Sequence, residues 1–196
     1  MAKPRLFLLD GAAVAYRAYF AFIKNPRKTT KGFDTSAVYG FMDTLLMILK
    51  KQQPDYFAVV FDSPVPTFRH KMYKEYKANR EEMPEDLSKG FPYIHRMVKA
   101  MNLPVFAKPG FEADDIIGTL VKRAQKEKIE SVIVSGDKDF MQLIGPDVKM
   151  YKPKWPNDWS MADEKDVMEK FGVKPEQVID MLALMGDASD NVPGVP

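Results

Sequence analysis

The sequence contains no cysteine and only two histidines, His70 and His95, among its 196 residues. The absence of cysteine excludes disulfide scaffolds, zinc ribbons, iron–sulfur clusters and thiol nucleophiles. Two histidines leave little scope for a histidine-based metal centre, so a metal site in this chain must be built from oxygen ligands. Such ligands favour hard cations, namely Mg²⁺ or Mn²⁺.

Long apolar runs are also missing. The first run, Leu6–Leu9, is interrupted by Asp10 and is too short for the apolar core of a signal peptide, and no window of about 18 apolar residues follows. We therefore expect a cytoplasmic protein with no membrane partner. The glycine-rich dinucleotide loop, the phosphate loop of nucleotide hydrolases and the nucleophile elbow of serine hydrolases are absent as well.

What is present is typical of one folded domain, with 45% apolar and 29% charged residues. Strand-like runs alternate with helical patterns, which predicts an α/β fold with a mainly parallel central sheet and helices on both faces. The expected strands are 6–9, 56–61, 103–106, 131–134 and 148–151. The expected helices are 36–51, 87–101, 113–126, 163–171 and 175–185.

Two segments depart from this alternation. Residues 63–92 are polar, basic and rich in proline, and they are longer than an ordinary connection, so we expect them to be functional or mobile and not a simple linker. Residues 160–196 are predicted to form a helical extension. Both are interpreted as parts of a single domain over 1–196.

Acidic residues follow three of the expected strands. Asp10 comes directly after the first, Asp62 after the second, and Asp137 and Asp139 after the fourth. Because the carboxyl ends of parallel strands meet at one edge of a sheet, where such folds bind ligands, we expect these side chains to converge. The alternative is that each acid forms a local turn.

A second acidic group opens the expected helix 113–126, as Glu112, Asp114 and Asp115. Acids in the first turn also favour the helix dipole, so capping is the alternative interpretation here. Asp187 and Asp190 lie near the C-terminal end. Convergence favours a metal site, because unpaired charges a few ångströms apart repel by about 4 kcal/mol per pair at a surface-like dielectric. The predicted metal ligands are Asp10, Asp62, Glu112, Asp114, Asp115, Asp137, Asp139, Asp187 and Asp190.

The net charge supports that interpretation. The chain has 29 basic and 27 acidic residues, so setting the nine predicted ligands aside leaves 29 bases against 18 acids, or +11. An acidic crevice in an otherwise basic protein indicates a polyanion held against metal ions.

Residues 68–80 carry five bases against a single acid, Glu75. Four of the bases recur at every third position, so a helix here would carry a drifting basic stripe, with tyrosines free to stack on nucleic-acid bases. A solvated helix face is the alternative. The position of this stretch just after Asp62 favours nucleic acid, and Arg17, beside Tyr16, is interpreted in the same way. The predicted nucleic-acid contacts are Arg17, Arg69, Lys71, Tyr73, Lys74 and Tyr76.

Linked motifs extend this pattern over almost the whole chain. They are Leu9-Asp10-Gly11, Tyr16-Arg17-Ala18-Tyr19-Phe20, Ala37-Val38-Tyr39-Gly40-Phe41, Phe61-Asp62, Thr67-Phe68-Arg69, Tyr76-Lys77-Ala78-Asn79-Arg80, Glu112-Ala113-Asp114-Asp115, Gly136-Asp137-Lys138-Asp139 and Gly186 to Val195. In order and register they closely resemble the 5′ nuclease domain of bacterial DNA polymerase I, a member of the flap endonuclease superfamily.

The resemblance implies a PIN-like fold and a structure-specific 5′ nuclease that removes RNA primers and 5′ flaps with two or more Mg²⁺ or Mn²⁺ ions. It implies that residues 63–92 form a basic helical arch or clamp with Arg69, Lys77 and Arg80 near phosphates, and that Lys77 and Arg80 are catalytic residues whose positive charge lies beside the reacting phosphate. The implied partners are DNA with a 5′ flap, nicked or branched duplex, and an RNA primer on DNA. A monomer is expected.

The chain departs from the family pattern in two places. Residues 152–159 match no family motif. The sequence also ends at Pro196, before the family's helix-hairpin-helix, and it contains no polymerase portion. We therefore expect a piece of a longer protein, with a polymerase domain among the possible neighbours.

Two other classes of function remain open. A PIN-like metal-dependent ribonuclease would share the acids, but it would need neither the long basic stretch nor the motif over 186–191. A non-catalytic nucleic-acid-binding module would tolerate loss of the acids, and all nine are present.

Overall fold

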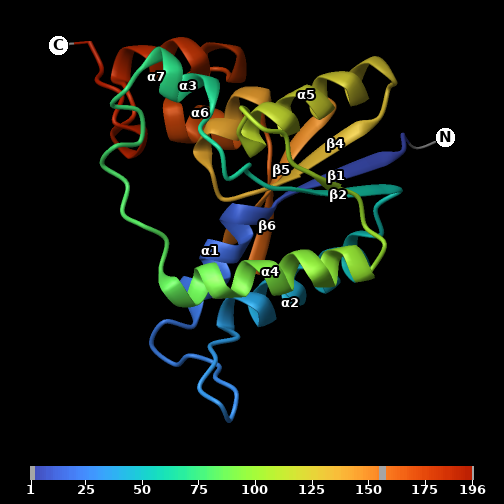
Figure 1. Cartoon of the computed structure of the whole chain (residues 1–196). Helices are drawn as coiled ribbons and strands as arrows, with labels where there is room; N and C mark the ends of the chain where they lie inside the picture. Colours follow the sequence, from blue (N-terminus) through green and yellow to red (C-terminus); the bar gives the residue numbers. More distant parts are fainter. Residues whose placement is uncertain (1–2, 155–157, 196) are drawn as a thin grey trace.

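The computed structural model describes residues 3–154 and 158–195. Its centre is a six-stranded sheet with the order β3-β2-β1-β4-β5-β6, in which all neighbours are parallel except the antiparallel pair β5–β6 (Figure 1). The strands are β1 (Arg5–Asp10), β2 (Tyr56–Val60), β3 (Val105–Phe106), β4 (Glu130–Val134), β5 (Val148–Lys154) and β6 (Asp158–Ala162). The predicted α/β architecture with a mainly parallel sheet is confirmed.

Helices lie on both sides of this sheet (Figure 1). The α-helices are α1 (Gly11–Ala21), α2 (Ser36–Gln52), α3 (Phe68–Met72), α4 (Glu85–Ala100), α5 (Ala113–Lys126), α6 (Glu164–Phe171) and α7 (Val178–Met185). Short 3₁₀ turns are η1 (Lys138–Leu143), η2 (Pro175–Gln177) and η3 (Ala188–Asp190). None of the helices in the described part of the chain is long and apolar enough to cross a membrane.

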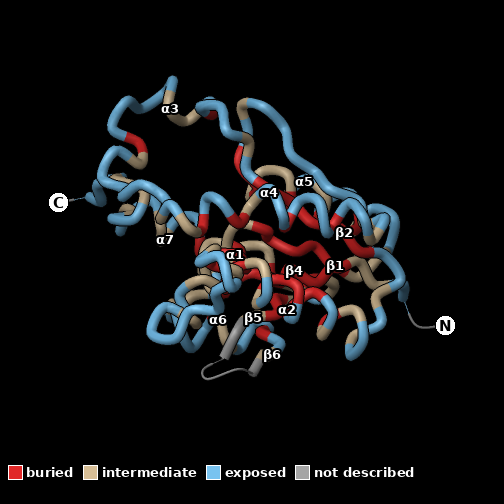
Figure 2. Tube along the Cα trace, turned by 60° about the horizontal axis from the view of Figure 1, so that its bottom comes forward, coloured by how far each residue is buried: buried red, intermediate tan, exposed pale blue. Residues whose placement is uncertain are grey.

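Alternation along the strands divides the core into two layers. In β1, Phe7 and Leu9 face one layer, which α1, α2 and α4 cover, whereas Leu8 faces the layer of α5, η1, α6 and α7. The central strands are buried on both faces, as parallel strands usually are (Figure 2). Both faces of the sheet are therefore closed, and its carboxyl edge is the place where side chains from several strands meet.

Gly11 joins β1 to α1 at this edge. A Cβ atom on Gly11 would lie 2.2 Å from the ring of Phe61, which follows β2. No other residue type fits without moving that ring, so the glycine allows α1 to begin immediately after Asp10. The first turn of α1 is thereby held beside the end of β2.

The sheet and helix boundaries differ from expectation in three places. Helix α1 was not predicted from the sequence. The strand expected over 103–106 shortens to two residues. Residues 160–162, expected in the helical extension, instead complete β6, because a hairpin pairs them with β5. Of the unmatched segment 152–159, residues 155–157 lie outside the described residues.

The basic segment 63–92, called the arch from here on, is less helical than expected. Only α3, five residues long, and the start of α4 are helical, while residues 74–79 form turns. Like charges at three-residue spacing destabilise a continuous helix. Turning the chain instead lets Tyr76 and Lys77 reach carboxylates, as the site below shows.

Candidate active site

Asp10 is the last residue of β1 and is buried. One carboxylate oxygen accepts a hydrogen bond from the amide of Ala13 at 3.0 Å and so caps α1, and the other accepts one from the hydroxyl of Ser135 at 2.9 Å. Burial raises the pKa of Asp10 to about 6, and the charges of Asp62 and Asp137 act in the same direction. The two hydrogen bonds act to lower this pKa, but burial outweighs them. Asp10 is thus fixed in position while its charge lacks a compensating cation.

Neighbouring acids are fixed in the same manner at the ends of β2 and β4. Asp62 accepts a hydrogen bond at 2.8 Å from the amide of Ala113, the first residue of α5. Asp137 caps η1 by accepting from the amide of Asp139 at 2.9 Å, and its own amide donates to Ser135. Asp10 and Asp137 thus cap the helical turns that follow them, a local role like the alternative interpretation, whereas Asp62 is held by an amide 51 residues away in the chain.

Asp114, in the first turn of α5, is the most strongly perturbed of the acids. Burial raises its pKa to about 8, and the charges of Asp10, Asp137, Asp62 and Glu112 raise it in the same direction. Four other acids therefore act on one half-buried carboxyl group. An arrangement of this kind favours either a proton or a bound cation.

The pKa of Asp114 gives a test in metal-free protein. Because folding raises this pKa from 3.8 to about 8, folding favours the neutral form, and wild type loses stability as pH rises from about 4 through about 8. Asp114→Asn is always neutral, so it is expected to be more stable than wild type by on the order of 3 kcal/mol at pH 8 and equal to it near pH 4. Urea unfolding in chelator at a series of pH values measures this difference. A difference that does not change with pH would contradict the proposed environment of Asp114.

Asp115 serves as the matched control for that experiment, because its environment has the opposite effect. Burial acts to raise its pKa, but hydrogen bonds from Arg69 and from the amide of Glu112 outweigh burial and hold the pKa below its ordinary value. Its stabilising contribution is present at neutral pH and is lost on acidification. Asp115→Asn is therefore expected to be less stable than wild type at neutral pH.

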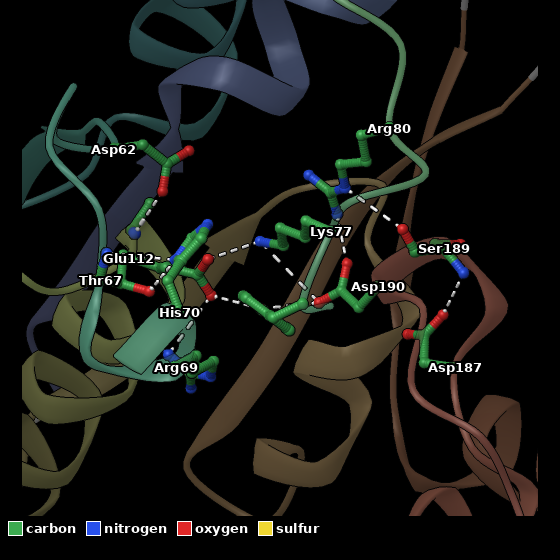
Figure 3. A network of polar contacts seen from close by, with 12 residues as sticks. Asp62, Thr67, Arg69, His70, Lys77, Arg80, Glu112, Asp187, Ser189 and Asp190 are labelled. Atoms are coloured by element: carbon green, nitrogen blue, oxygen red, sulfur yellow. Dashed lines mark hydrogen bonds and ion pairs between the residues drawn. The ribbon is translucent and has the colours of Figure 1, made fainter. Parts of the chain in front are cut away.

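A second acidic group lies beside the first. Burial raises the pKa of Asp139 to about 6, and the charges of Asp137, Asp187 and Asp190 act in the same direction. One carboxylate oxygen of Asp139 is buried without a hydrogen-bond partner among the described residues. Asp187 caps η3 by accepting from the amide of Ser189 at 2.8 Å (Figure 3). Asp137 acts on both groups and connects them.

These residues fit hard divalent cations. The donors are carboxylate oxygens, three of the carboxyl groups have raised pKa values, and a buried oxygen of Asp139 is unpaired. Within the described residues, no three acidic side chains are placed so that they could bind one metal ion without moving.

Cations from the arch pair with three of the acids, Glu112, Asp115 and Asp190, and Figure 3 shows the pairs that Lys77 and Arg80 form. The Nζ atom of Lys77 lies 2.6 Å from Oε1 of Glu112 and 3.8 Å from Oδ2 of Asp190. The hydroxyl oxygen of Tyr76 lies 2.9 Å from Oε2 of Glu112 and 2.8 Å from Oδ2 of Asp190, and its single hydrogen is shared between these two acceptors. Tyr76 is 7% exposed, so the structure buries the ring that was expected to stack on nucleic-acid bases.

The same part of the arch contacts η3 through backbone groups. The amide of Lys77, whose φ is +58°, donates to the carbonyl of Asp190 at 3.0 Å. Arg80 lies 2.5 Å from Oδ1 of Asp190, and Asn79 donates to the carbonyl of Ala188 at 2.8 Å. In return Asn191 donates to the carbonyl of Glu75 at 2.8 Å. A left-handed conformation is costly for a lysine, and these contacts hold Lys77 in it.

Arg69 neutralises the beginning of α5. Its guanidinium forms two hydrogen bonds to Asp115, at 2.8 and 2.9 Å, and lies 3.3 Å from Oε2 of Glu112. The hydrogen bonds to Asp115 raise the pKa of Arg69 despite partial burial. Asp115 also accepts from the amide of Glu112 and so completes a capping box. Both oxygens of Asp115 are therefore engaged by protein groups.

The remaining predicted contact residues lie outside this cluster. Lys71, Tyr73 and Lys74 are exposed on the outer part of the arch. Arg17 lies in a separate hollow of about 300 Å³, where its guanidinium is 5.0 Å from the ring centre of Trp159. The structure thus brings Arg69, Tyr76, Lys77 and Arg80 to the acids and leaves these four away from them.

Three contributors were not identified from the sequence. Ser135, at the end of β4, holds Asp10 and the amide of Asp137. Asn79 and Asn191 join the arch to η3. A polar residue at the end of a buried strand was an available signal for Ser135. The asparagines lie inside two motifs that carry the family resemblance, but their contacts could not be inferred, because their partners are backbone carbonyls more than 100 residues away in the chain.

Two hollows lie on either side of the contacts that Tyr76 and Lys77 make with Glu112. The acid hollow, of about 630 Å³, is lined by Asp10, Asp62, Asp137, Lys77 and Arg80, among others. The α5 hollow, also of about 630 Å³, lies on the other side and is lined in part by Arg69, Tyr76, Asp139 and the outer face of α5. Glu112 and Asp114 line both.

Comparisons with known proteins agree with this fold. A family model described as the 5′-3′ exonuclease, N-terminal resolvase-like domain matches residues 5–172. The chain is 43% identical over 197 residues to DNA polymerase I of Bacillus caldotenax, covering 99% of this chain and 22% of the polymerase. It is 41% identical over 190 residues to a 5′-3′ exonuclease of Aquifex aeolicus (strain VF5), covering 97% and 64%.

Among solved structures, T5 5′-exonuclease with bound zinc superimposes with a TM-score of 0.76 at 25% identity, covering 97% of this chain and 70% of that chain. The chain spans about a fifth of the length of the polymerase relatives and less than two thirds of the Aquifex exonuclease. Because the family model covers most of the sequence, the chain belongs to the family of 5′-3′ exonuclease N-terminal, resolvase-like domains.

Proposed function

We propose that this chain is a metal-dependent 5′-3′ exonuclease and 5′-flap endonuclease that hydrolyses phosphodiester bonds of DNA and removes RNA primers paired to DNA. The observation that carries the proposal is the convergence of acids from three strand ends and the start of α5, directly beside the cations of the arch. Membership of the exonuclease family supports it, as do the polymerase and exonuclease relatives.

The proposed cofactors are two or more Mg²⁺ or Mn²⁺ ions. Asp10, Asp62, Glu112, Asp114 and Asp137 would hold one group of ligand positions, and Asp139, Asp187 and Asp190 a second. Bound divalent cations lower the pKa of an attacking water and neutralise charge on the scissile phosphate and its leaving oxygen. The T5 exonuclease, described with bound zinc, supports the general requirement for a divalent metal.

The chain's own residues would position the substrate. Lys77 and Arg80 line the acid hollow, where their charges are available to a phosphate entering it. Ser135 and the amide of Ala113 hold Asp10 and Asp62 in place. The hydroxyl of Tyr76 orients Glu112. Each of these contacts reduces the reorganisation required when the substrate and the metal ions bind.

The proposed substrates are DNA with a 5′ flap, nicked or branched duplex, and an RNA primer on DNA. We propose that the chain acts as a monomer in the cytoplasm and that a polymerase domain accompanies it in the longer protein. The relatives named DNA polymerase I, of which it spans about a fifth, support this last point.

A substrate panel tests this function. The chain is mixed with a labelled 5′-flap duplex, blunt duplex DNA, single-stranded DNA and single-stranded RNA, each with Mg²⁺ and with excess chelator. We expect Mg²⁺-dependent cleavage of the flap duplex near the branch point and little cleavage of single-stranded RNA. Preferential cleavage of the RNA would favour a PIN-like ribonuclease, and binding without cleavage would indicate a non-catalytic module.

A further inference from the structure

The α5 hollow contains a cluster of cations that the proposed chemistry does not use. Lys122, Arg123 and Lys126 line it together with the arch residues Arg69 and Tyr76. All three α5 residues are exposed, and none forms an ion pair within the described ranges. Their positive charges are therefore available to a ligand.

The acids and these bases occupy opposite ends of one helix. Asp114 and Asp115 lie in the first turn of α5, and Arg123 and Lys126 in the last. Asp114 and Lys126 are twelve residues apart, which corresponds to about 18 Å along an α-helix. Because the hollow follows this helix, it extends from the proposed metal ligands to a group of free cations several nucleotides away.

The shape of the hollow limits what it can hold. Its volume of about 630 Å³ is in the range of pockets that enclose one drug-sized ligand, so it has room for a short length of single strand. Tyr76 and Lys77 bridge to Glu112 between this hollow and the acid hollow. A strand that continues from the acid hollow into the α5 hollow would therefore pass the arch at these contacts.

A simpler account explains part of the pattern. Bases in the last turn of a helix interact favourably with its dipole, which would explain Arg123 and Lys126 as stabilising residues. Lys122 directly precedes Arg123 and lies just outside the last turn, so the dipole explains it less well, and the dipole does not explain why all three side chains line the same hollow as the acids. The two accounts differ in what they predict for binding.

We propose that Lys122, Arg123 and Lys126 form a phosphate-binding track for the single-stranded 5′ flap on the side of the arch away from Asp10 and Asp62. The proposal rests on the function proposed above and deepens it, because it assigns a site to the unpaired part of the substrate. These residues contribute to the affinity for the flap and not to the chemical step.

The test compares two variants that lose equal charge. Lys122→Gln/Lys126→Gln removes two lysines of the track. Lys50→Gln/Lys99→Gln removes two exposed lysines from α2 and α4, on the opposite layer of the molecule. Glutamine keeps a high helix propensity, so both pairs are expected to fold like wild type, and thermal unfolding checks this.

Binding is measured by fluorescence anisotropy in chelator, where the DNA stays intact, on duplexes with no flap, a short flap and a long flap over a series of salt concentrations. For the long flap, the track variant is expected to bind about tenfold more weakly, with a slope of log K against log salt that is shallower by about 1.4, or about 0.7 for each lost contact to a single strand. For the duplex without a flap, it should match the control pair.

Equal losses on all three substrates would overturn the proposal, because they would show that the track binds duplex. Lower thermal stability with unchanged binding would overturn it in favour of the helix-dipole account. The single-turnover rate with Mg²⁺ at saturating enzyme distinguishes a failure of this inference from a failure of the proposed nuclease function. If wild type cleaves flaps and the track variant binds them normally, only the inference fails. If wild type does not cleave, the proposed function fails.

Discussion

Replacing Asp10 with asparagine is expected to slow single-turnover cleavage of a 5′-flap duplex by about a thousandfold, equivalent to about 4 kcal/mol of lost transition-state stabilisation. Asp10 is buried at the end of β1 and is perturbed by the charges of Asp62 and Asp137, so it lies at the centre of the proposed metal site. Asparagine has nearly the same shape and can still accept the hydrogen bond from Ala13. The loss should therefore appear in the rate and not in folding.

The control for this variant is Asp43→Asn, the same chemical change at an exposed position on α2. It should cleave like wild type. DNA affinity measured in chelator is expected to be unchanged or slightly higher for Asp10→Asn, since one negative charge near the phosphates is gone. A variant that retained more than about a tenth of the wild-type rate would place the reacting phosphate elsewhere.

The second large effect is expected for Lys77. Its side chain reaches into the acid hollow, and its backbone is held in a left-handed conformation by the carbonyl of Asp190. Lys77→Gln should lower the single-turnover rate by about a hundredfold if the ammonium group stabilises charge on the reacting phosphate. Quenched-flow measurements with enzyme in excess over the flap substrate give this rate without a contribution from product release.

Lys74→Gln removes the same charge from the same arch, but Lys74 is exposed and lies outside the cluster of acids. It is expected to change affinity and its salt dependence without lowering the rate at saturation. Equal rate losses for Lys74→Gln and Lys77→Gln would show that the arch acts by its overall charge. The specific placement of Lys77 beside Glu112 would then have no role in the chemistry.

The acidic residues at the carboxyl edge of the sheet could be predicted from the sequence, because two general rules were sufficient. Apolar runs alternating with helical patterns imply a parallel sheet, and the ends of parallel strands meet at one edge. The positions of Asp10, Asp62 and Asp137 follow from those rules without any knowledge of tertiary contacts. Helix α5 was predicted with its observed bounds, because its first-turn acids and its apolar spacing agree.

The arch could not be predicted in the same way. Its local sequence is compatible with a basic helix, but long-range contacts to η3, more than 100 residues away in the chain, determine its conformation. Tyr76 is buried because its hydroxyl has two carboxylate acceptors, neither of which the spacing of residues 68–80 could reveal. For the same reason, local sequence could not distinguish Asp115, which pairs with Arg69, from Asp114 beside it.

Lys77 and Arg80 of the arch pair with Glu112 and Asp190 in this structure. Divalent cations would bring positive charge to the same carboxylates, so they would replace part of what Lys77 and Arg80 provide. The side chains of Lys77 and Arg80 would then be available to a phosphate. This links the acids, the arch and the substrate in one arrangement of charges.

The central claim is that the converging carboxylates are a cation site at which phosphodiester bonds are hydrolysed. Its most direct test is a metal titration of chelated protein with a labelled 5′-flap duplex. The account predicts no cleavage in excess chelator, cleavage that rises as Mg²⁺ or Mn²⁺ is added back, and no such rise for Asp10→Asn. Undiminished cleavage in excess chelator would contradict it.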